Sequence, residues 1–130
     1  MDQMTLDALR SIVGQDKVLT GDDAVIVKDG IGFRRYERHN GLENAVPKAS
    51  CVVKVQSTGQ VSEVLKLLNE KKIPTAPRTG GSSVTLGIEP EVGGVILDGS
   101  DMNEILELNE RDMMVTVRCG TPLADRKSVV

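Results

Sequence analysis

The chain has 130 residues and a formal net charge of −3 at pH 7, which leaves room for one compact domain but not for a nucleotide domain plus a substrate domain. The acidic balance supplies no excess of cations for a phosphate backbone, so nucleic acid is not an expected partner. Aromatic residues make up 2% of the chain and tryptophan is absent, which excludes base-stacking platforms and sugar-binding aromatic faces.

Membrane and metal sites are disfavoured as well. No apolar run approaches the roughly 20 residues that span a bilayer, so no transmembrane segment is expected. The first residues lack the basic and apolar regions of a signal peptide, and we expect a cytoplasmic protein. Cys51 and Cys119 show no CxxC spacing, which predicts two buried small hydrophobic residues rather than a zinc site.

The first predicted element is a short amphipathic helix over residues 5–14. Its apolar side chains share one face and Gly14 provides a C-cap. These side chains are Leu6, Leu9, Ile12 and Val13. The charged, glycine-rich stretch that follows contains one apolar run, residues 24–27, which fits either a strand or a buried loop segment.

A strand and a helix are predicted next. The β-branched run 51–55 follows Pro47 and indicates a buried strand. Ser57 and Gln60 form a capping-box pattern, and the apolar spacing after them predicts a helix that ends near residue 71. Strand and helix together form half of a βαβ unit. Residues 73–77 are extended again, and their two prolines restrict them to a sheet edge or to positions where no ladder hydrogen bond is needed.

The C-terminal third adds a strand and a hairpin. Residues 93–98 predict another buried strand, and two apolar runs flank the polar turn 109–112 as in a β-hairpin. Thr121 and Pro122 have the residue types of a helix start, and the chain stops soon after them, so this helix is expected to be cut short. The pattern predicts an α+β fold with a βαβ core and an additional hairpin.

A loop of small residues lies between the extended segment 73–77 and the strand 93–98. Gly80 and Gly81 would let backbone N–H groups converge on an anion. The hydroxyls of Ser82 and Ser83 add donors, and Arg78 can neutralise charge. A diphosphate is the natural ligand of such a loop. The pattern matches neither the P-loop nor the GxGxxG loop, so those two nucleotide folds are disfavoured.

Several spaced motifs between residues 47 and 120 occur in a recognisable order. They are Pro47, the helix 61–71, the segments 73–74 and 77–83, Pro90, the strand 93–98, and the segments 102–106 and 115–117 ahead of Gly120. In this order they resemble the FAD-binding domain of the vanillyl-alcohol oxidase and p-cresol methylhydroxylase type. More narrowly, they resemble the glycolate oxidase subunit and D-lactate dehydrogenase branch of FAD-linked oxidases.

The resemblance implies the first subdomain of a p-cresol methylhydroxylase-type (PCMH-type) FAD-binding domain, whose loop wraps the FAD pyrophosphate. The cofactor-binding residues that it implies are Arg78, Thr79, Gly80, Gly81, Ser82, Ser83 and Gly87. Thr79 and Leu86 stand where the family often has glycine. Some relatives attach flavin through a loop histidine, whereas this loop has serines and the only histidine, His39, lies upstream. Bound FAD is therefore expected to be non-covalent.

The resemblance also implies a division of the chain and a parent reaction. Residues 1–46 would form an N-terminal helix and lead-in segment, and residues 47–130 a partial FAD-binding domain truncated at its C-terminus. A second flavin-binding segment and the substrate domain are missing, so a second polypeptide or domain would complete the flavin site. The parent reaction is hydride transfer from a 2-hydroxy acid such as glycolate or D-lactate to flavin. No catalytic residue is assigned.

The sequence leaves two other hypotheses about function open. In one, the loop holds another phosphate ligand and Asp98, Asp101 or Glu104 acts as a general acid or metal ligand, although carboxylates around a strand end usually form a solvated turn. In the other, the chain is a poorly folded remnant that binds nothing.

Overall fold

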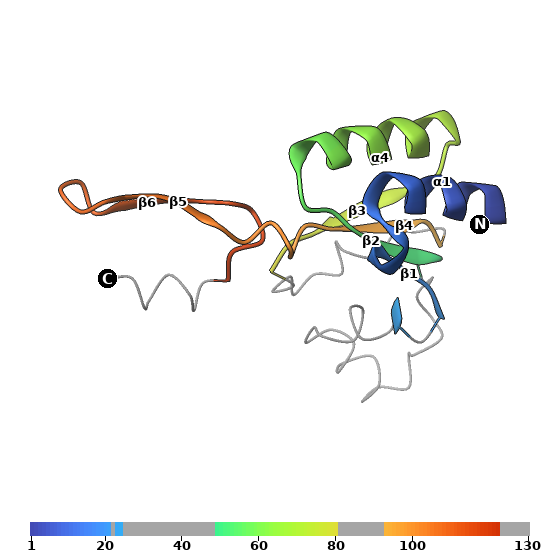
Figure 1. Cartoon of the computed structure of the whole chain (residues 1–130), viewed down its shortest axis with the longest axis horizontal. Helices are drawn as coiled ribbons and strands as arrows, with labels where there is room; N and C mark the ends of the chain where they lie inside the picture. The colour runs from blue at the N-terminus through green and yellow to red at the C-terminus, as the bar shows by residue number, and fades with distance from the viewer. Residues whose placement is uncertain (22, 25–48, 81–92, 123–130) are drawn as a thin grey trace.

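The structure, a computed structural model, describes residues 1–21, 23–24, 49–80 and 93–122 (Figure 1). Two α-helices, a short 3-10 helix and six strands are described. In chain order they are α1 (Gln3–Val13), η1 (Gln15–Lys17), β1 (Val18–Leu19), β2 (Cys51–Lys54), α4 (Thr58–Glu70), β3 (Thr75–Arg78), β4 (Val95–Asp98), β5 (Ile105–Asn109) and β6 (Met114–Val117). They form a mixed α+β fold, as the sequence predicts.

Four of the strands form one sheet in the order β1-β2-β4-β3. β2, β4 and β3 are parallel, and β1 runs antiparallel to β2. Helix α4 joins β2 to β3, and β4 lies between these two strands, which confirms the predicted βαβ core. β3 lies at an edge of the described sheet. There the missing backbone N–H of Pro77 interrupts no hydrogen-bond ladder between inner strands.

Helix α1 has a defined cap at each end. An oxygen of the Asp2 side chain accepts a hydrogen bond from the backbone N–H of Thr5 at 2.7 Å, which is the usual role of an N-cap residue. Gly14, with φ 105°, ends the helix, and its N–H donates to the carbonyl of Arg10. The sequence predicts this end correctly, but the helix starts two residues before the predicted 5–14 segment.

The start of helix α4 departs slightly from the predicted capping box. The hydroxyl of Ser57 accepts a hydrogen bond from the backbone N–H of Gln60, as predicted. The side-chain oxygen of Gln60 reaches back to the N–H of Gln56, one residue before the cap. The pair still satisfies two donors at the helix start, which is the function of a capping box.

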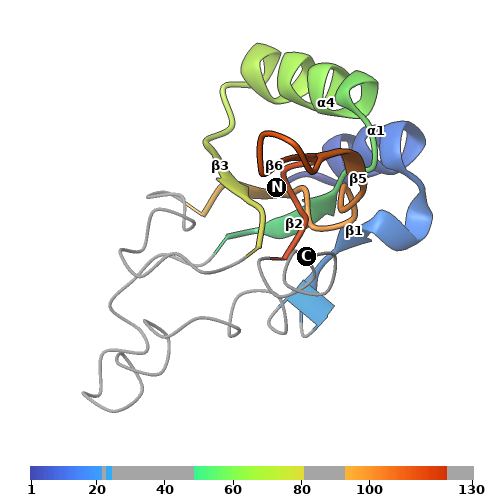
Figure 2. The same ribbon diagram turned by 90° about the vertical axis from the view of Figure 1, so that its left-hand side faces the viewer.

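Helices α1 and α4 lie side by side over one face of the sheet (Figures 1 and 2), and the main core lies between the two layers. Strand residues alternate between this core and a smaller cluster on the opposite face. The main core contains Leu9, Val13, Val18, Cys51, Val53, Val55, Val64, Leu68, Val95, Leu97 and Met102. The second cluster contains Ala24, Ala49, Val52 and Ile96. The inner strands are therefore buried on both faces, as their apolar sequences predict.

β5 and β6 form the predicted hairpin as a separate two-stranded ribbon that extends away from the sheet (Figure 1). Leu108 pairs with Val115 and Ile105 with Val117, so these four apolar side chains share one face of the ribbon. Leu108 is 41% exposed and Val115 38%. The hairpin thus presents an apolar face that nothing in the described part of the chain covers.

One sequence prediction is wrong and others fall outside the described residues. Cys119 is exposed rather than buried, because it follows β6 at the base of the projecting hairpin. The segment 25–27 of the apolar run and the helix expected after Pro122 lie outside the described residues. Among the described residues, no helix is long and apolar enough to cross a membrane.

Candidate functional site

Three charged residues end the three parallel strands. Lys54 ends β2, Asp98 ends β4 and Arg78 ends β3, and the strand register places both cations beside Asp98. These three side chains form a charged row on the sheet face opposite helices α1 and α4. Side chains two residues apart on a strand share a face, and Arg78 lies two residues after Ala76, which pairs with Ile96 of the second cluster. The carboxyl ends of parallel strands are the usual place for ligand binding in α/β sheets.

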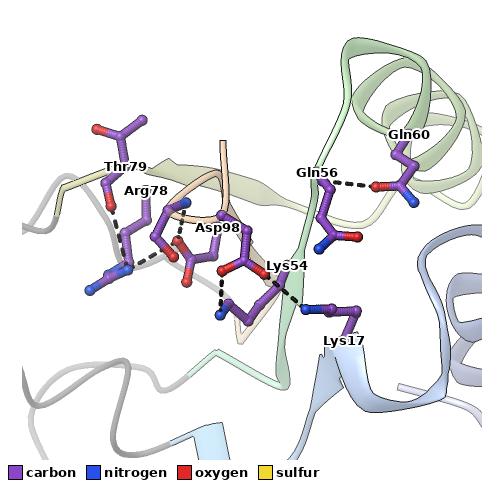
Figure 3. Close-up of polar contacts among 9 residues, drawn as sticks. Lys17, Lys54, Gln56, Gln60, Arg78, Thr79 and Asp98 are labelled. Carbon is purple, nitrogen blue, oxygen red and sulfur yellow. Dashed lines mark hydrogen bonds and ion pairs between the residues drawn. The ribbon is translucent and has the colours of Figure 1, made fainter. Parts of the chain in front are cut away.

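Arg78 and Asp98 form a buried ion pair (Figure 3). Nη1 of Arg78 lies 3.0 Å from Oδ1 of Asp98, whose side chain is only 1% exposed. The same oxygen accepts a hydrogen bond from the backbone N–H of Ser100 at 3.0 Å, and the N–H of Gly99 donates to the carbonyl of Arg78 at 2.8 Å. These bonds tie the end of β3 to the turn that follows β4.

A second ion-pair group is centred on Asp101, in that same turn. Nζ of Lys54 lies 2.7 Å from one carboxylate oxygen and Nζ of Lys17 3.0 Å from the other. The hydrogen bond from Lys54 is the main cause that lowers the pKa of Asp101, and the bond to Asp101 raises the pKa of Lys17. With Arg78 and Asp98, the cluster has three cations and two carboxylates, so it carries one net positive charge.

Asp101→Asn should destabilise the folded chain by about 1 kcal/mol at pH 7, because two lysines then face each other without a full counter-charge. The pKa of Asp101 is lowered in the folded state, so its contribution is present above the ordinary aspartate pKa, about 4, and is lost as pH falls below it. Urea unfolding at pH 7 and pH 3 measures the free energy of unfolding of wild type and variant. The difference in this free energy should shrink at pH 3, and a constant difference would contradict the contribution assigned to Asp101. Asp7→Asn on α1 is the control.

The predicted cofactor loop begins at this cluster. Arg78 is the last residue of β3, and Thr79 and Gly80 follow directly at the carboxyl edge of the sheet. A Cβ added at Gly80 would meet nothing within 4 Å. The remaining predicted loop residues lie outside the described part of the chain; they are Gly81, Ser82, Ser83 and Gly87.

The structure changes the expected surroundings of Arg78. The sequence predicts a guanidinium whose charge is available to a phosphate, but its Nη1 donates to Asp98 and lies 3.5 Å from the carbonyl oxygen of Thr79. Nε of Arg78 is buried and has no hydrogen-bond partner in the described ranges. Lys17 and Lys54 are cations that sequence reasoning missed. Their only signal was the position of Lys54 at the end of a buried strand.

The carboxylates considered as acids or metal ligands are all in ion pairs. Asp98 faces Arg78, Asp101 faces two lysines, and Glu104 lies 2.6 Å from Nε of Arg118. In residues 1–21, 23–24, 49–80 and 93–122 there is no group of three side chains that could hold a metal ion. The alternative of a metal-dependent enzyme therefore gains no support from this cluster.

Comparison with known proteins identifies the family of the chain. Residues 49–128 match the protein family described as FAD binding domain. The chain belongs to the FAD-binding domain family. Relatives of this FAD-binding domain include the uncharacterised FAD-linked oxidoreductase YgcU of Escherichia coli, 42% identical over 91% of the chain. The glycolate oxidase subunit GlcD of Bacillus subtilis is 32% identical over 57% of the chain.

Solved structures support the same fold. A p-cresol methylhydroxylase superposes on 97% of this FAD-binding domain with a TM-score of 0.77 and 24% identity, and an alkyldihydroxyacetonephosphate synthase on 99% with a TM-score of 0.79 and 20% identity. The chain spans 24% of the length of YgcU and 16% of GlcD. The PCMH-type fold and the resemblance to FAD-linked oxidoreductases are thereby confirmed.

The described residues fit the pyrophosphate of FAD. Among the described residues, the two ion-pair groups at this edge hold three cations against two carboxylates, and a buried N–H of Arg78 lacks a partner in the same part of the chain. The loop that starts there is rich in glycine, and backbone N–H groups of such loops bind phosphate oxygens. Bound FAD supplies the redox chemistry of this protein family, and the chain supplies its binding.

Proposed function

We propose that the FAD pyrophosphate binds in the loop that begins at the end of β3, at the carboxyl edge of the parallel strands. The residues that hold it are Arg78, Thr79, Gly80, Gly81, Ser82, Ser83 and Gly87. The observation that carries this proposal is the position of Thr79 and Gly80 immediately beside the charged row at the strand ends. The flavin is bound non-covalently.

The whole protein transfers a hydride from a 2-hydroxy acid such as glycolate or D-lactate to the flavin. Support comes from GlcD, which is named as a glycolate oxidase subunit, and from a relative named D-lactate dehydrogenase in Anaerostipes hadrus, 38% identical over 57% of the chain. The flavin carries out the redox step, and the residues of this chain orient it. No residue of this chain is assigned as the acid or base of the reaction.

A further domain or polypeptide completes the flavin site. The exposed apolar face of the β5–β6 hairpin supports this, because a two-stranded ribbon is marginally stable until its apolar face is covered.

Residues 1–46 form an N-terminal helix and lead-in segment, and residues 47–130 form the partial FAD-binding domain, although α1 shares the main core. The location is cytoplasmic, in keeping with the free thiol of Cys119.

A fluorescence titration of the chain with FAD tests the proposed function. Wild type should bind saturably, and Arg78→Ala and Gly81→Val should each weaken binding at least about tenfold, or about 1.4 kcal/mol. A valine at position 81 blocks the close approach of backbone to phosphate that glycine allows.

Arg10→Ala is the matched control, because Arg10 also holds a carboxylate, Asp7, at 3.0 Å but lies on helix α1. Its affinity for FAD should equal that of wild type. A folded wild type that fails to bind FAD at high micromolar concentrations would reject the proposal. Binding that is indifferent to both loop changes would place the cofactor elsewhere.

A further inference from the structure

We infer that Asp98 is a positioning residue for the cofactor loop. It holds the guanidinium of Arg78, and the pair fixes the start of the loop instead of offering net positive charge to the phosphate. This inference rests on the proposed function, because it concerns how the same loop is kept ready for FAD. It assigns a role to Asp98, which is not among the expected binding residues.

The Arg78–Asp98 pair has no net charge. Opposite charges 3.0 Å apart act on a third charge mainly as a dipole, so Asp98 offsets much of the attraction that Arg78 would exert on a phosphate. Asp98 is almost fully buried, and an isolated buried carboxylate is costly, so it holds its partner firmly. The net positive charge of the cluster comes from Lys17 and Lys54, which share the single carboxylate of Asp101.

A network of hydrogen bonds surrounds the Arg78–Asp98 pair. One oxygen of Asp98 accepts from both Arg78 and the N–H of Ser100, while the carbonyl of Asp98 accepts from the N–H of Val55 at 2.9 Å. The residue therefore bonds to β3, to the residue that follows β2 and to the turn after β4. The loop starts at the next residue after Arg78, so its starting direction is set by this network.

The shape of the arginine side chain also favours a positioning role. Nη1 lies between Asp98 and the carbonyl of Thr79, the first residue of the loop. The planar guanidinium holds this one nitrogen in a fixed direction, whereas a lysine ammonium is a compact charge on a flexible stem. Lysine at position 78 would keep the charge and lose this geometry, which separates a positioning role from charge neutralisation.

The test is a double-mutant cycle with Arg78→Lys, Asp98→Asn and the combined variant. The Kd values for FAD and for ADP, which shares the pyrophosphate, are measured at several NaCl concentrations. Thermal unfolding of every variant is first followed by circular dichroism, and the Kd values are measured at a temperature at which all variants are fully folded. A loss of global stability alone would then leave the Kd unchanged. Arg10→Lys and Asp7→Asn form the matched control pair on α1, with the same 3.0 Å contact.

A positioning role predicts that both single changes weaken the binding of FAD and ADP about tenfold, and that the double variant binds within about twofold of the weaker-binding single variant. The salt dependence of Arg78→Lys, which keeps the charge at position 78, should stay that of wild type. Near-normal affinity of Arg78→Lys would overturn the inference even if Asp98→Asn does not fold. Tighter binding by Asp98→Asn, or additive losses, would overturn it as well. A folded wild type that binds neither ligand would reject the proposed function itself.

Discussion

Gly94→Ala should destabilise the chain by about 3 kcal/mol and weaken its hold on FAD. A Cβ at this position would lie 1.9 Å from the carbonyl oxygen of Pro74 and 2.7 Å from its carbonyl carbon. That carbonyl accepts the hydrogen bond from Val95 at the start of the β3–β4 ladder, and the carbonyl of Gly94 accepts from Ser50. The clash is with backbone held on both sides, so the strands themselves must separate.

The measurement is urea unfolding followed by circular dichroism. Gly59→Ala is the control, because the same change there adds a Cβ whose nearest neighbour is 3.8 Å away, inside helix α4. It should leave stability unchanged or raise it by about 0.5 kcal/mol, since alanine favours helix more than glycine does. Equal stability of Gly94→Ala and wild type would show that β3 and β4 do not approach as closely as described.

Leu68→Ala should cost about 3 kcal/mol of unfolding free energy. Leu68 is 1% exposed in the core between helix α4 and the sheet, so its truncation leaves a cavity that the packed strands cannot fill. Leu65→Ala, three residues earlier on the same helix, truncates a side chain that is 42% exposed and should cost less than about 0.5 kcal/mol. Similar losses at the two positions would mean that α4 does not present its described face to the sheet.

Most of the fold could be predicted because its signals are local. The β-branched runs predicted β2 and β4, the Ser57 cap predicted the start of α4, and the polar turn predicted the hairpin. β1 could not be predicted, because it has two residues and exists only by pairing with β2. The burial of Cys119 was mispredicted because the residue type favours a core, whereas its position at the hairpin base leaves it exposed.

The site was predicted less completely, because its contacts are distant in sequence. Small residues after a strand identified the loop at Thr79 and Gly80, which the structure places at the carboxyl edge of the sheet. The pairing of Arg78 with Asp98, 20 residues away, follows only from the insertion of β4 beside β3. The contact between Lys17 and Asp101 spans 84 residues and leaves no pattern in the sequence.

The most direct test of the account is a ¹⁵N NMR titration of the chain with FAD, with riboflavin as the comparison ligand that lacks the pyrophosphate. We expect FAD to shift the backbone amide signals of Thr79, Gly80 and Gly99 and to leave those of the α1 helix unchanged, whereas riboflavin should not reproduce the shifts at the strand ends. Shifts confined to the β5–β6 hairpin, or equal effects of the two ligands at Thr79 and Gly80, would contradict a pyrophosphate site at the end of β3.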